Sequence, residues 1–311
     1  MRPDLRYYER YRDLVDDWAA FRASLATPLP VAFWVNPLRT TPERLAAALA
    51  EETGVAPAPL PWAPGAFRWT DEASKPGRTL TYAMGHYAVQ EEAALLPVRL
   101  LAPRPHERIL DLCAAPGNKT AQMAVAMENR GTVVANDARW ARLAPVRRVL
   151  ERLGILNVVA TVEDGAIFPD AAGPFDAVLA DVPCSCDATV RKHPRVVLRQ
   201  DEERRRRVRG LQRAILRRAV ALCRPGGRIV YATCTFAPEE NESVVSDVLA
   251  DPGGVTLRAV EVPGLRVCPG LTAWQGETFH PSLTRSLRLW PQDNDTGGFF
   301  VAVLDKPGGT P

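Results

Sequence analysis

The stretch RILDLCAAPGNKT, residues 108–120, joins a short apolar run to a turn of small residues and then to the start of a helix. The apolar run predicts a buried β-strand, and Gly117 suits a tight turn before a helix whose first amides are free to face a ligand. Similar apolar runs recur, separated by helical segments: TVVAND (132–137), NVVATVED (157–164), FDAVLADV (175–182), RIVYATCT (228–235) and GGFFVAVLD (297–305). This alternation predicts an α/β fold over residues 98–311, in which helices cover both faces of a mostly parallel, Rossmann-like sheet.

Residues 1–97 lack the regular alternation of apolar runs and helical segments, and they predict a smaller α/β module with a linker. The elements expected there are a short helix over residues 7–21, a strand in TPLPVAFWVN (27–36) and a helix in TPERLAAALAEETG (41–54), capped by Thr41 and stopped by Gly54. The stretch VAPAPLPWAPGAFRWT (55–70) is too rich in Pro and Gly to predict regular structure.

The composition excludes several classes of protein. The 311 residues are 46% hydrophobic and 24% charged, which is enough to bury a full core. The charged and aromatic start has no apolar leader and no later run would span a bilayer, so we predict a cytoplasmic protein that does not enter a membrane. Six sparse, irregularly spaced cysteines favour thiols over a disulfide framework. Because the net charge is only +3, affinity for a polyanion would have to come from local clusters of Arg and Lys.

Acidic residues end the first three strands of the predicted sheet. They are Asp111, Asp137 and Asp164, and ligands of such sheets bind beyond the carboxyl ends of the strands. Asp137 lies about twenty residues beyond the first turn, where a carboxylate accepts hydrogen bonds from ribose hydroxyls, and Asp164 would face an adenine edge. Neither G-x-G-x-x-G nor a P-loop is present. The pattern therefore favours S-adenosylmethionine, which carries an adenosine but no phosphate.

Two cysteines follow the fourth and fifth strands, Cys184 in ADVPCSCD and Cys234 in YATCTFAPEENE. In a doubly wound sheet these thiols lie side by side at the cofactor edge. Carbon 5 of cytosine is a weak nucleophile, and thiolate addition at carbon 6 raises its electron density, which is covalent catalysis. Asp181 would hydrogen-bond the cytosine edge and Lys119 would be a supporting cation. The other cysteines at positions 113, 223 and 268 are expected to have no catalytic role, since free Cys is usually buried.

These residues resemble a known family. The strings DLCAAPGNKT, VVANDARWARL, ADVPCS, VRKHP, YATCTFAPEENE and RLWPQDNDTGGFFVAVL are similar to those of the Sun-domain (NOL/NOP/Sun) RNA cytosine-5 methyltransferases. The segments YYERYRDL, ATPLPVAFWVN, LPWAPGAFRW and PGLRVCPGLTAW resemble most the eukaryotic tRNA branch.

The resemblance implies a class I S-adenosylmethionine-dependent methyltransferase with a seven-stranded sheet and a small N-terminal RNA-binding domain. It implies that Cys234 is the nucleophile and that Cys184 assists release of the methylated product. The implied cofactor contacts are Cys113, Ala114, Ala115, Pro116, Gly117, Asn118, Lys119, Asp137, Arg142, Asp164 and Asp181.

Three positions depart from the family pattern. Asn118 stands where Gly or Ser is usual, Cys186 where Gly is usual, and Thr235 where Ser is common. None of these changes removes a reacting atom, although Cys186 is expected to alter the loop that carries Cys184. The chain also ends soon after the predicted catalytic domain, so the substrate of the eukaryotic tRNA enzymes is not carried over.

RNA contact calls for positive charge near the reacting base. Arg191 and Lys192 follow the Cys184 loop and are predicted to hold a phosphate, whereas the arginine-rich segment 199–223 is equally well explained as a solvated helix face. Trp34, Trp62 and Trp69 are expected to be buried between the two domains. The predicted partner is tRNA, with rRNA as the alternative, and we expect a monomer.

Other interpretations remain open at this point. Cys184 would be the nucleophile if its Pro-Cys motif worked as in DNA cytosine-5 enzymes, and a non-catalytic RNA-binding or assembly protein could retain the fold. Cys184 and Cys186 with His193 also offer ligands for a zinc ion. No fourth ligand has a finger-like spacing, and we predict no metal.

Overall fold

The computed structural model describes residues 5–71, 74–199, 201–252 and 254–308. The outermost residues of the two predicted domains, 1–4 and 309–311, lie outside this part of the chain. Among the described residues no helix combines the length and the apolar character needed to cross a bilayer.

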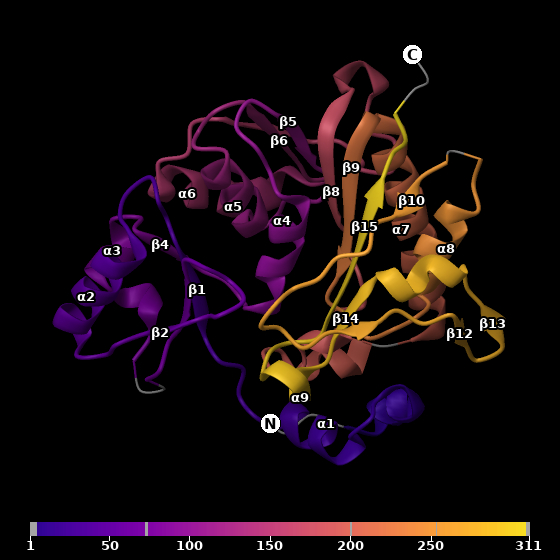
Figure 1. Cartoon of the computed structure of the whole chain (residues 1–311), viewed down its shortest axis with the longest axis horizontal. Coiled ribbons are helices and arrows are strands. Elements are labelled where there is room, and N and C mark those ends of the chain that lie inside the picture. Colours follow the sequence, from indigo (N-terminus) through magenta and orange to yellow (C-terminus); the bar gives the residue numbers. More distant parts are fainter. Residues whose placement is uncertain (1–4, 72–73, 200, 253, 309–311) are drawn as a thin grey trace.

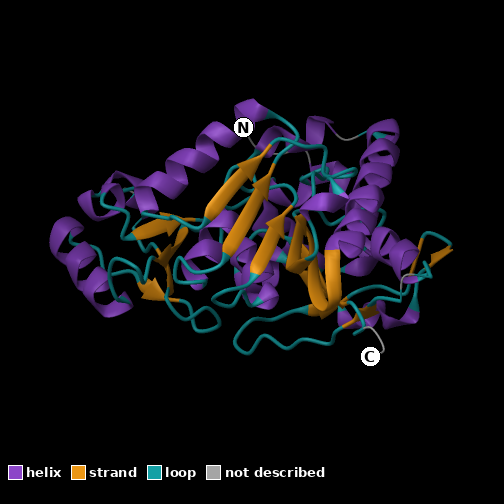
Figure 2. Cartoon of the chain, turned by 90° about the horizontal axis from the view of Figure 1, so that it is seen from above, coloured by secondary structure: helices purple, strands orange, loops and turns teal. Residues whose placement is uncertain are grey.

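One large sheet forms the centre of the molecule (Figures 1 and 2). Its main strands are β5 (Arg108–Asp111), β6 (Thr132–Asn136), β7 (Val158–Thr161), β8 (Phe175–Asp181), β9 (Cys223–Thr233), β14 (Leu287–Leu289) and β15 (Phe299–Asp305). They lie in the order β7-β6-β5-β8-β9-β15-β14, with the first five parallel and β15 antiparallel to both of its neighbours. Two short strands, β10 (Thr256–Leu257) and β11 (Cys268–Pro269), extend the sheet to nine strands within the described residues. The predicted strands are thus present, and β14 is an addition that the sequence analysis missed.

Alternating residues of the strands face two separate hydrophobic cores. In β8, Val178 and Ala180 belong to the core that includes α7 (Glu202–Leu222) and α8 (Glu242–Leu249). Ala177 and Leu179 face the other core, which contains α4 (Leu96–Leu101), α5 (Asn118–Ala126) and part of α6 (Trp140–Leu153). Figure 1 shows these two groups of helices on opposite sides of the sheet. Both faces are therefore covered, as the apolar runs predicted.

A second, smaller sheet lies beside the first, in the order β2-β3-β1-β4. Its strands are β1 (Ala32–Val35), β2 (Ala58–Pro59), β3 (Ala66–Arg68) and β4 (Tyr87–Val89), and the associated helices are α2 (Pro42–Thr53) and α3 (Leu80–Ala83). Thr41 caps α2 and Gly54 ends it in the left-handed region, as predicted. The prediction of no regular structure over 55–70 was wrong, because β2 and β3 lie there. Pro59 is tolerated because β2 is an edge strand, which needs no donor on its free side.

Residues 5–25 do not pack on that small sheet. They form a 3₁₀ helix, Leu5–Leu14, and then α1 (Trp18–Leu25), where one helix over 7–21 was predicted. The chain breaks between them because the Asp17 side chain caps α1. Tyr8, Tyr11 and Phe21 are fully buried in the α7 core, in edge contacts with Phe236. In Figure 1, α1 accordingly lies beneath α9 (Pro291–Asn294), away from β1.

Trp34, Trp62 and Trp69 are buried, as predicted, but only the first two lie between the two sheets. Trp34 and Trp62 belong to the core that continues under α4, so they pack between the two sheets, while Trp69 belongs to the small core around Phe33. The remaining elements are the hairpin β12 (Ala273–Trp274) and β13 (Glu277–Thr278), and the 3₁₀ turns Pro76–Arg78, Ala93–Leu95, Asp170–Ala172, Asp187–Thr189, Pro194–Arg199 and Pro281–Arg285.

A buried ion pair fixes the segment that follows β9. The carboxylate of Glu242 receives two hydrogen bonds from Arg288, and the side chains are 0% and 3% exposed. The same guanidinium donates to the carbonyl of Phe236 at 2.9 Å. Strand β14 therefore holds the turn that leads from β9 into α8.

Replacing Arg288 by Met is expected to lower the free energy of unfolding by about 3–5 kcal/mol, because the carboxylate of Glu242 would remain buried without a cationic partner. Arg147→Met, which breaks the exposed pair with Glu151, is the matched control and should leave the unfolding curve unchanged. Chemical denaturation followed by circular dichroism measures both variants. Equal stability of the two would show that the buried pair does not matter.

Candidate active site

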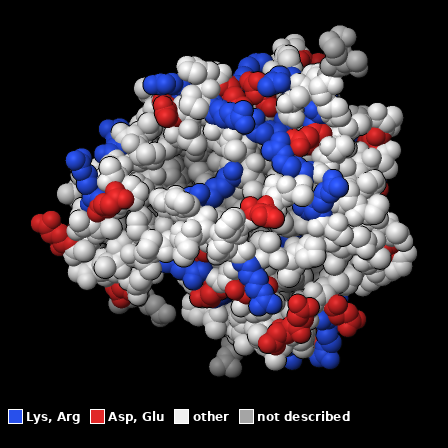
Figure 3. Space-filling view, viewed as in Figure 1, with Lys and Arg blue, Asp and Glu red and all other residues white. Residues whose placement is uncertain are grey.

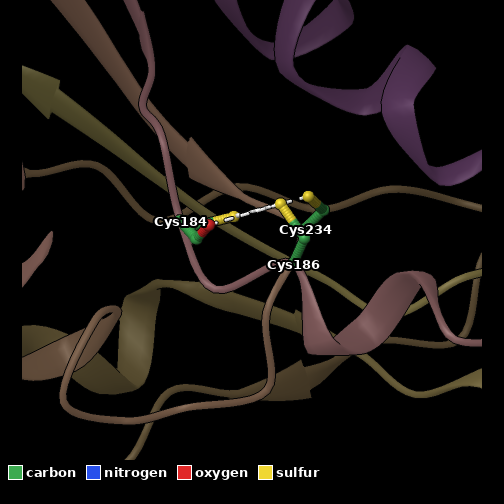
Figure 4. Close-up of side chains that lie close together, drawn as sticks. All are labelled: Cys184, Cys186 and Cys234. Atoms are coloured by element: carbon green, nitrogen blue, oxygen red, sulfur yellow. Dashed lines mark hydrogen bonds between the residues drawn. The ribbon is translucent and has the colours of Figure 1, made fainter. Parts of the chain in front are cut away.

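The thiols of Cys184 and Cys234 meet where two neighbouring parallel strands end. Cys234 follows the last residue of β9, and Cys184 lies three residues beyond β8. Their sulfur atoms are 3.4 Å apart (Figure 4). The predicted proximity of these two side chains is therefore found in the structure.

A third thiol joins this pair. The sulfur of Cys186 lies 3.6 Å from that of Cys184 and also contacts the carbonyl oxygen of Cys184 at 3.3 Å. Figure 4 shows the three side chains converging from two loops. Cys186 has a φ of 60°, the left-handed region that favours glycine, so a backbone made for Gly carries a side chain here.

Hydrogen bonds within the cluster give the three thiols different pKa values. Hydrogen bonds with Cys184 and Cys234 lower the pKa of Cys186 to about 3. Hydrogen bonds with Cys186 and Cys234, together with burial, raise the pKa of Cys184 well above its ordinary value. For Cys234, the hydrogen bond with Cys184 lowers the pKa, but the interaction with Cys186 and burial outweigh it and the pKa is raised. These contacts lower the pKa of Cys186 relative to the pKa values of the other two thiols.

The carboxylate of Asp187 ties the two cysteine loops together and to the N-terminal segment. It is fully buried. Its side chain accepts hydrogen bonds from Tyr7 (2.9 Å), Tyr11 (2.7 Å), Thr235 (2.7 Å) and the amide of Phe236 (2.8 Å), and its carbonyl accepts one from Tyr8 (2.7 Å). The sequence analysis did not identify Asp187. The signal was the Asp that follows Cys-Ser-Cys, together with the otherwise unexplained YYERY string.

Two further contacts join the same loops. The hydroxyls of Ser185 and Thr235 lie 2.8 Å apart, and Glu240 accepts hydrogen bonds from the Ser185 amide at 2.8 Å and from Gln212 of α7 at 3.0 Å. Thr235 keeps the hydroxyl that Ser would supply, so this departure from the family pattern preserves the contacts of the hydroxyl with Ser185 and Asp187. Burial raises the pKa of Glu240 to about 7.

A cavity of about 270 Å³ opens at the carboxyl ends of β5, β8 and β9. The predicted site residues that line it are Cys113, Ala114, Ala115, Pro116, Asn118, Lys119, Asp181, Arg191, Lys192 and Cys234. Gly117, Asp137, Arg142, Asp164 and Cys184 are not part of its lining. The chain segment before β15 closes the opposite wall with Gly297, Gly298 and Phe299.

The turn between β5 and α5 forms one wall of this cavity. Gly117 has a φ of 105°, and a Cβ at this position would lie 2.8 Å from the Cα of Val146. Only glycine therefore fits between the turn and α6. Asn118 starts α5, and its side-chain amide lies 3.5 Å from the carbonyl of Val89.

Acidic groups lie at the bottom and side of the cavity. Asp111 accepts a hydrogen bond from Thr120 through one oxygen, and its other carboxylate oxygen is buried without a hydrogen-bond partner in the described structure. Burial raises the pKa of Asp111 to about 7. Asp137, directly after β6, is buried and lies 3.0 Å from Arg142, which also donates to the carbonyl of Ala115 at 3.2 Å.

Lys119 and Asp181 form an ion pair between the turn and β8. The ammonium lies 2.7 Å from the carboxylate and 5.5 Å from the ring centre of Phe299. Burial lowers the pKa of Lys119, but the charge of Asp181 and its hydrogen bond outweigh this effect and the pKa is raised. A charged ammonium is therefore held beside the cavity that Cys234 lines.

Comparisons with known proteins show which sequences and structures this chain is similar to. A family model described as 16S rRNA methyltransferase RsmB/F matches residues 98–305. The chain is 36% identical to a tRNA (cytosine(49)-C(5))-methyltransferase of Pyrococcus abyssi, over 96% of the chain and 95% of that protein. It is also 36% identical to the human 28S rRNA (cytosine(4447)-C(5))-methyltransferase, over 98% of the chain but 39% of that protein. A crystal structure of a methyltransferase homolog from Pyrococcus horikoshii matches with a TM-score of 0.85 and 30% identity, covering 96% of this chain and 94% of that one.

The chain belongs to the RsmB/F family. The class I methyltransferase fold and the family predicted from the sequence are thereby confirmed. The equal identities to a tRNA and an rRNA relative do not separate the two substrates. The chain spans about two fifths of the human relative's length.

Two predicted residues of this RsmB/F protein have unexpected surroundings. Arg191 was predicted to hold an RNA phosphate, but its guanidinium is buried and donates to Thr27, Pro28, Asp295 and Thr296. It joins the N-terminal chain to the segment before β15, so the phosphate prediction does not fit it. The neighbouring Lys192 is exposed and lines the cavity.

Asp164 is also exposed, three residues beyond the end of β7, where its side chain accepts a hydrogen bond from the amide of Ala166.

The arginines of α7 are largely occupied by acidic partners. Ion pairs join Arg205 and Arg206 to Glu202, Arg207 to Glu203, Arg209 and Arg213 to Asp247, Arg217 to Asp251 and Arg218 to Asp170. Figure 3 shows basic and acidic side chains interspersed on the face seen in Figure 1. These contacts favour a role of α7 in packing against α8 over a role as a basic RNA-binding surface.

The raised pKa of Glu240 predicts a dependence of stability on pH. Folded Glu240 keeps its proton up to about pH 7, whereas the unfolded chain releases it above its ordinary value of 4.5. The folded state binds more protons between these values, so this group's contribution to stability falls as pH rises, by up to about 1.4 kcal/mol per pH unit. Glu240→Gln should give a shallower decline of the unfolding free energy from pH 4.5 to 7. Glu51→Gln, on the exposed surface of α2, controls for the lost charge, and identical slopes for the two variants would refute the assignment.

Proposed function

We propose that this protein is an S-adenosylmethionine-dependent RNA methyltransferase that methylates carbon 5 of a cytosine through a covalent adduct with Cys234. The observation that carries the proposal is the pair of thiols 3.4 Å apart at the ends of β8 and β9, one of which lines the cavity. Membership of the RsmB/F family and the cytosine-C5 methyltransferase names of its relatives support it.

The proposed reaction begins when the Cys234 thiolate adds to carbon 6 of the cytosine, which moves the electron pair of the 5,6 double bond toward carbon 5. Asp181 lines the cavity and would accept a hydrogen bond from the amino edge or a protonated ring nitrogen. The ammonium of Lys119 favours the thiolate form of Cys234 and the charge that develops on the ring.

Methyl transfer leaves a proton on carbon 5 that must be removed before the adduct can break. Removal of this proton restores the 5,6 double bond and expels the Cys234 thiolate. Cys184 is next to Cys234, and we assign to it assistance in this release. The two thiols thus divide addition and elimination.

The residues around the cavity fit the cofactor. The unpartnered oxygen of Asp111 provides an acceptor for a positively charged group, and the turn from Cys113 to Gly117 brings small side chains and backbone close to the site. Asp137 follows β6 and pairs with Arg142, and it remains predicted to accept hydrogen bonds from the ribose hydroxyls. S-adenosylmethionine supplies an electrophilic methyl group when bound. Asp164 remains predicted to contact adenine.

For the RNA we propose tRNA. A relative named for tRNA is 36% identical to this chain over 96% of its residues, and rRNA stays the alternative because a relative named for 28S rRNA is equally similar. Exposed Lys192 at the cavity is the proposed phosphate contact. A cytoplasmic monomer remains the prediction from the sequence.

Cys234→Ala is expected to reduce methyl transfer to the background level, since the adduct cannot form. Cys184→Ala should form the adduct but fail to resolve it, so that a protein–RNA species persists on a denaturing gel. Transfer of a tritiated methyl group to tRNA and rRNA transcripts measures activity and separates the two substrates.

Cys268→Ala removes a thiol outside the cluster and serves as the control. If 5-fluorocytosine RNA were trapped on Cys184 in place of Cys234, the roles of the two cysteines would be exchanged. RNA binding without any turnover of cofactor would instead support a non-catalytic protein.

Asp137→Ala should weaken S-adenosylmethionine binding by at least about tenfold, or about 1.4 kcal/mol, because a buried acceptor for the ribose is lost. Asp170→Ala, at an exposed carboxylate far along the chain from the turn, is the matched control. Calorimetric titration of both variants gives the dissociation constants, and equal values would remove Asp137 from the cofactor site.

A further inference from the structure

The three thiols of Cys184, Cys186 and Cys234 are spaced like the ligands of one metal ion. All three sulfur atoms lie within 4.8 Å of one another, with two separations of 3.4 and 3.6 Å. Zinc–thiolate bonds of about 2.3 Å at tetrahedral angles place neighbouring sulfurs about 3.8 Å apart. Within the part of the chain that the structure describes, no other group of three such side chains has this spacing.

The loops that carry these thiols are held in place by contacts outside the cluster. Asp187 and Glu240 bind both loops, and the hydroxyls of Ser185 and Thr235 connect them. The sulfur atoms are therefore brought together by the fold and not by a metal. A preorganised set of ligands pays little in conformational entropy on binding an ion.

Cys186 is the residue that turns a pair of thiols into a three-ligand set. Its φ of 60° is a backbone conformation suited to glycine. Neither addition to cytosine nor release of the product requires a third thiol.

We propose that Cys184, Cys186 and Cys234 together bind one thiophilic cation of the zinc class. Binding replaces each S–H proton by a metal–sulfur bond, so one proton is released for every ligand that was protonated beforehand. Tetrahedral coordination leaves a fourth position for water. This site was not predicted from the sequence, because the spacing of Cys184, Cys186 and His193 gave no reason to add Cys234 as a ligand.

Occupancy of the site has a consequence for catalysis that rests on the proposed function. A metal-bound Cys234 sulfur cannot add to cytosine, so the ion would be a reversible inhibitor. Wild-type protein should lose methyl transfer at Zn²⁺ concentrations at which the variant Cys186→Gly remains active. The activity of each protein is measured relative to that of its own chelator-treated sample.

The direct test measures metal binding without any assay of activity. Reduced wild-type protein, Cys186→Gly and Cys268→Ser are titrated with Cd²⁺, whose thiolate charge-transfer absorption reports the number of bound sulfurs. Zn²⁺ affinity is measured against a chromophoric chelator. The Gly variant suits the left-handed backbone and is expected to fold, which circular dichroism checks.

We expect wild type and Cys268→Ser to bind one Cd²⁺ with the intensity of three thiolates. Cys186→Gly should show two-thirds of that intensity and at least a tenfold weaker Zn²⁺ affinity, about 1.4 kcal/mol. Equal binding by wild type and Cys186→Gly, or an equal loss in Cys268→Ser, would overturn the proposal. Metal binding at three thiols in a protein that never methylates RNA would refute the proposed function and leave this site standing.

Discussion

The fully buried carboxylate of Asp187 is the contact on which the arrangement of the cysteine loops depends. Its two oxygens accept hydrogen bonds from the loop after β9 and from the N-terminal tyrosines, while its own backbone belongs to the loop after β8. A buried charge is costly unless several donors satisfy it. Here the donors come from two segments that are distant in sequence from Asp187, the N-terminal tyrosines and residues 235–236, so all three segments must be in place before the carboxylate is satisfied.

This requirement explains why the N-terminal segment packs against the large domain. The rings of Tyr8, Tyr11 and Phe21 surround Phe236, two residues beyond Cys234, and the tyrosine hydroxyls reach Asp187. The segment supports the site without lining the cavity. Arg191 has a comparable role on the other side, where its guanidinium joins residues 27–28 to residues 295–296.

Rigid loops also determine the chemistry of the thiols. Three sulfur atoms held within 4.8 Å share protons, and their ionisation is a property of the group. The short distance between Cys184 and Cys234 suits a reaction in which one thiol adds to the base and the other assists release. The spacing of all three sulfur atoms is also that of a thiolate metal site. Cys186 supplies the third sulfur of the metal site, and its contacts also raise the pKa of the other two thiols.

Local periodicity, with the rule that parallel strands end at one edge of a sheet, was enough to predict the alternating strands and helices from residue 98 onward, the adjacency of Cys184 and Cys234, and the turn at Gly117. The strands β2 and β3 escaped prediction, since pairing with β1 overrode the local signal of Pro and Gly. The tertiary structure alone decided that Asp187 bridges three segments, that Arg191 is a structural contact and that Cys186 joins the thiol pair. These outcomes depend on which donors and sulfur atoms meet across separations of about 50 to 180 residues, and no local pattern encodes such distances.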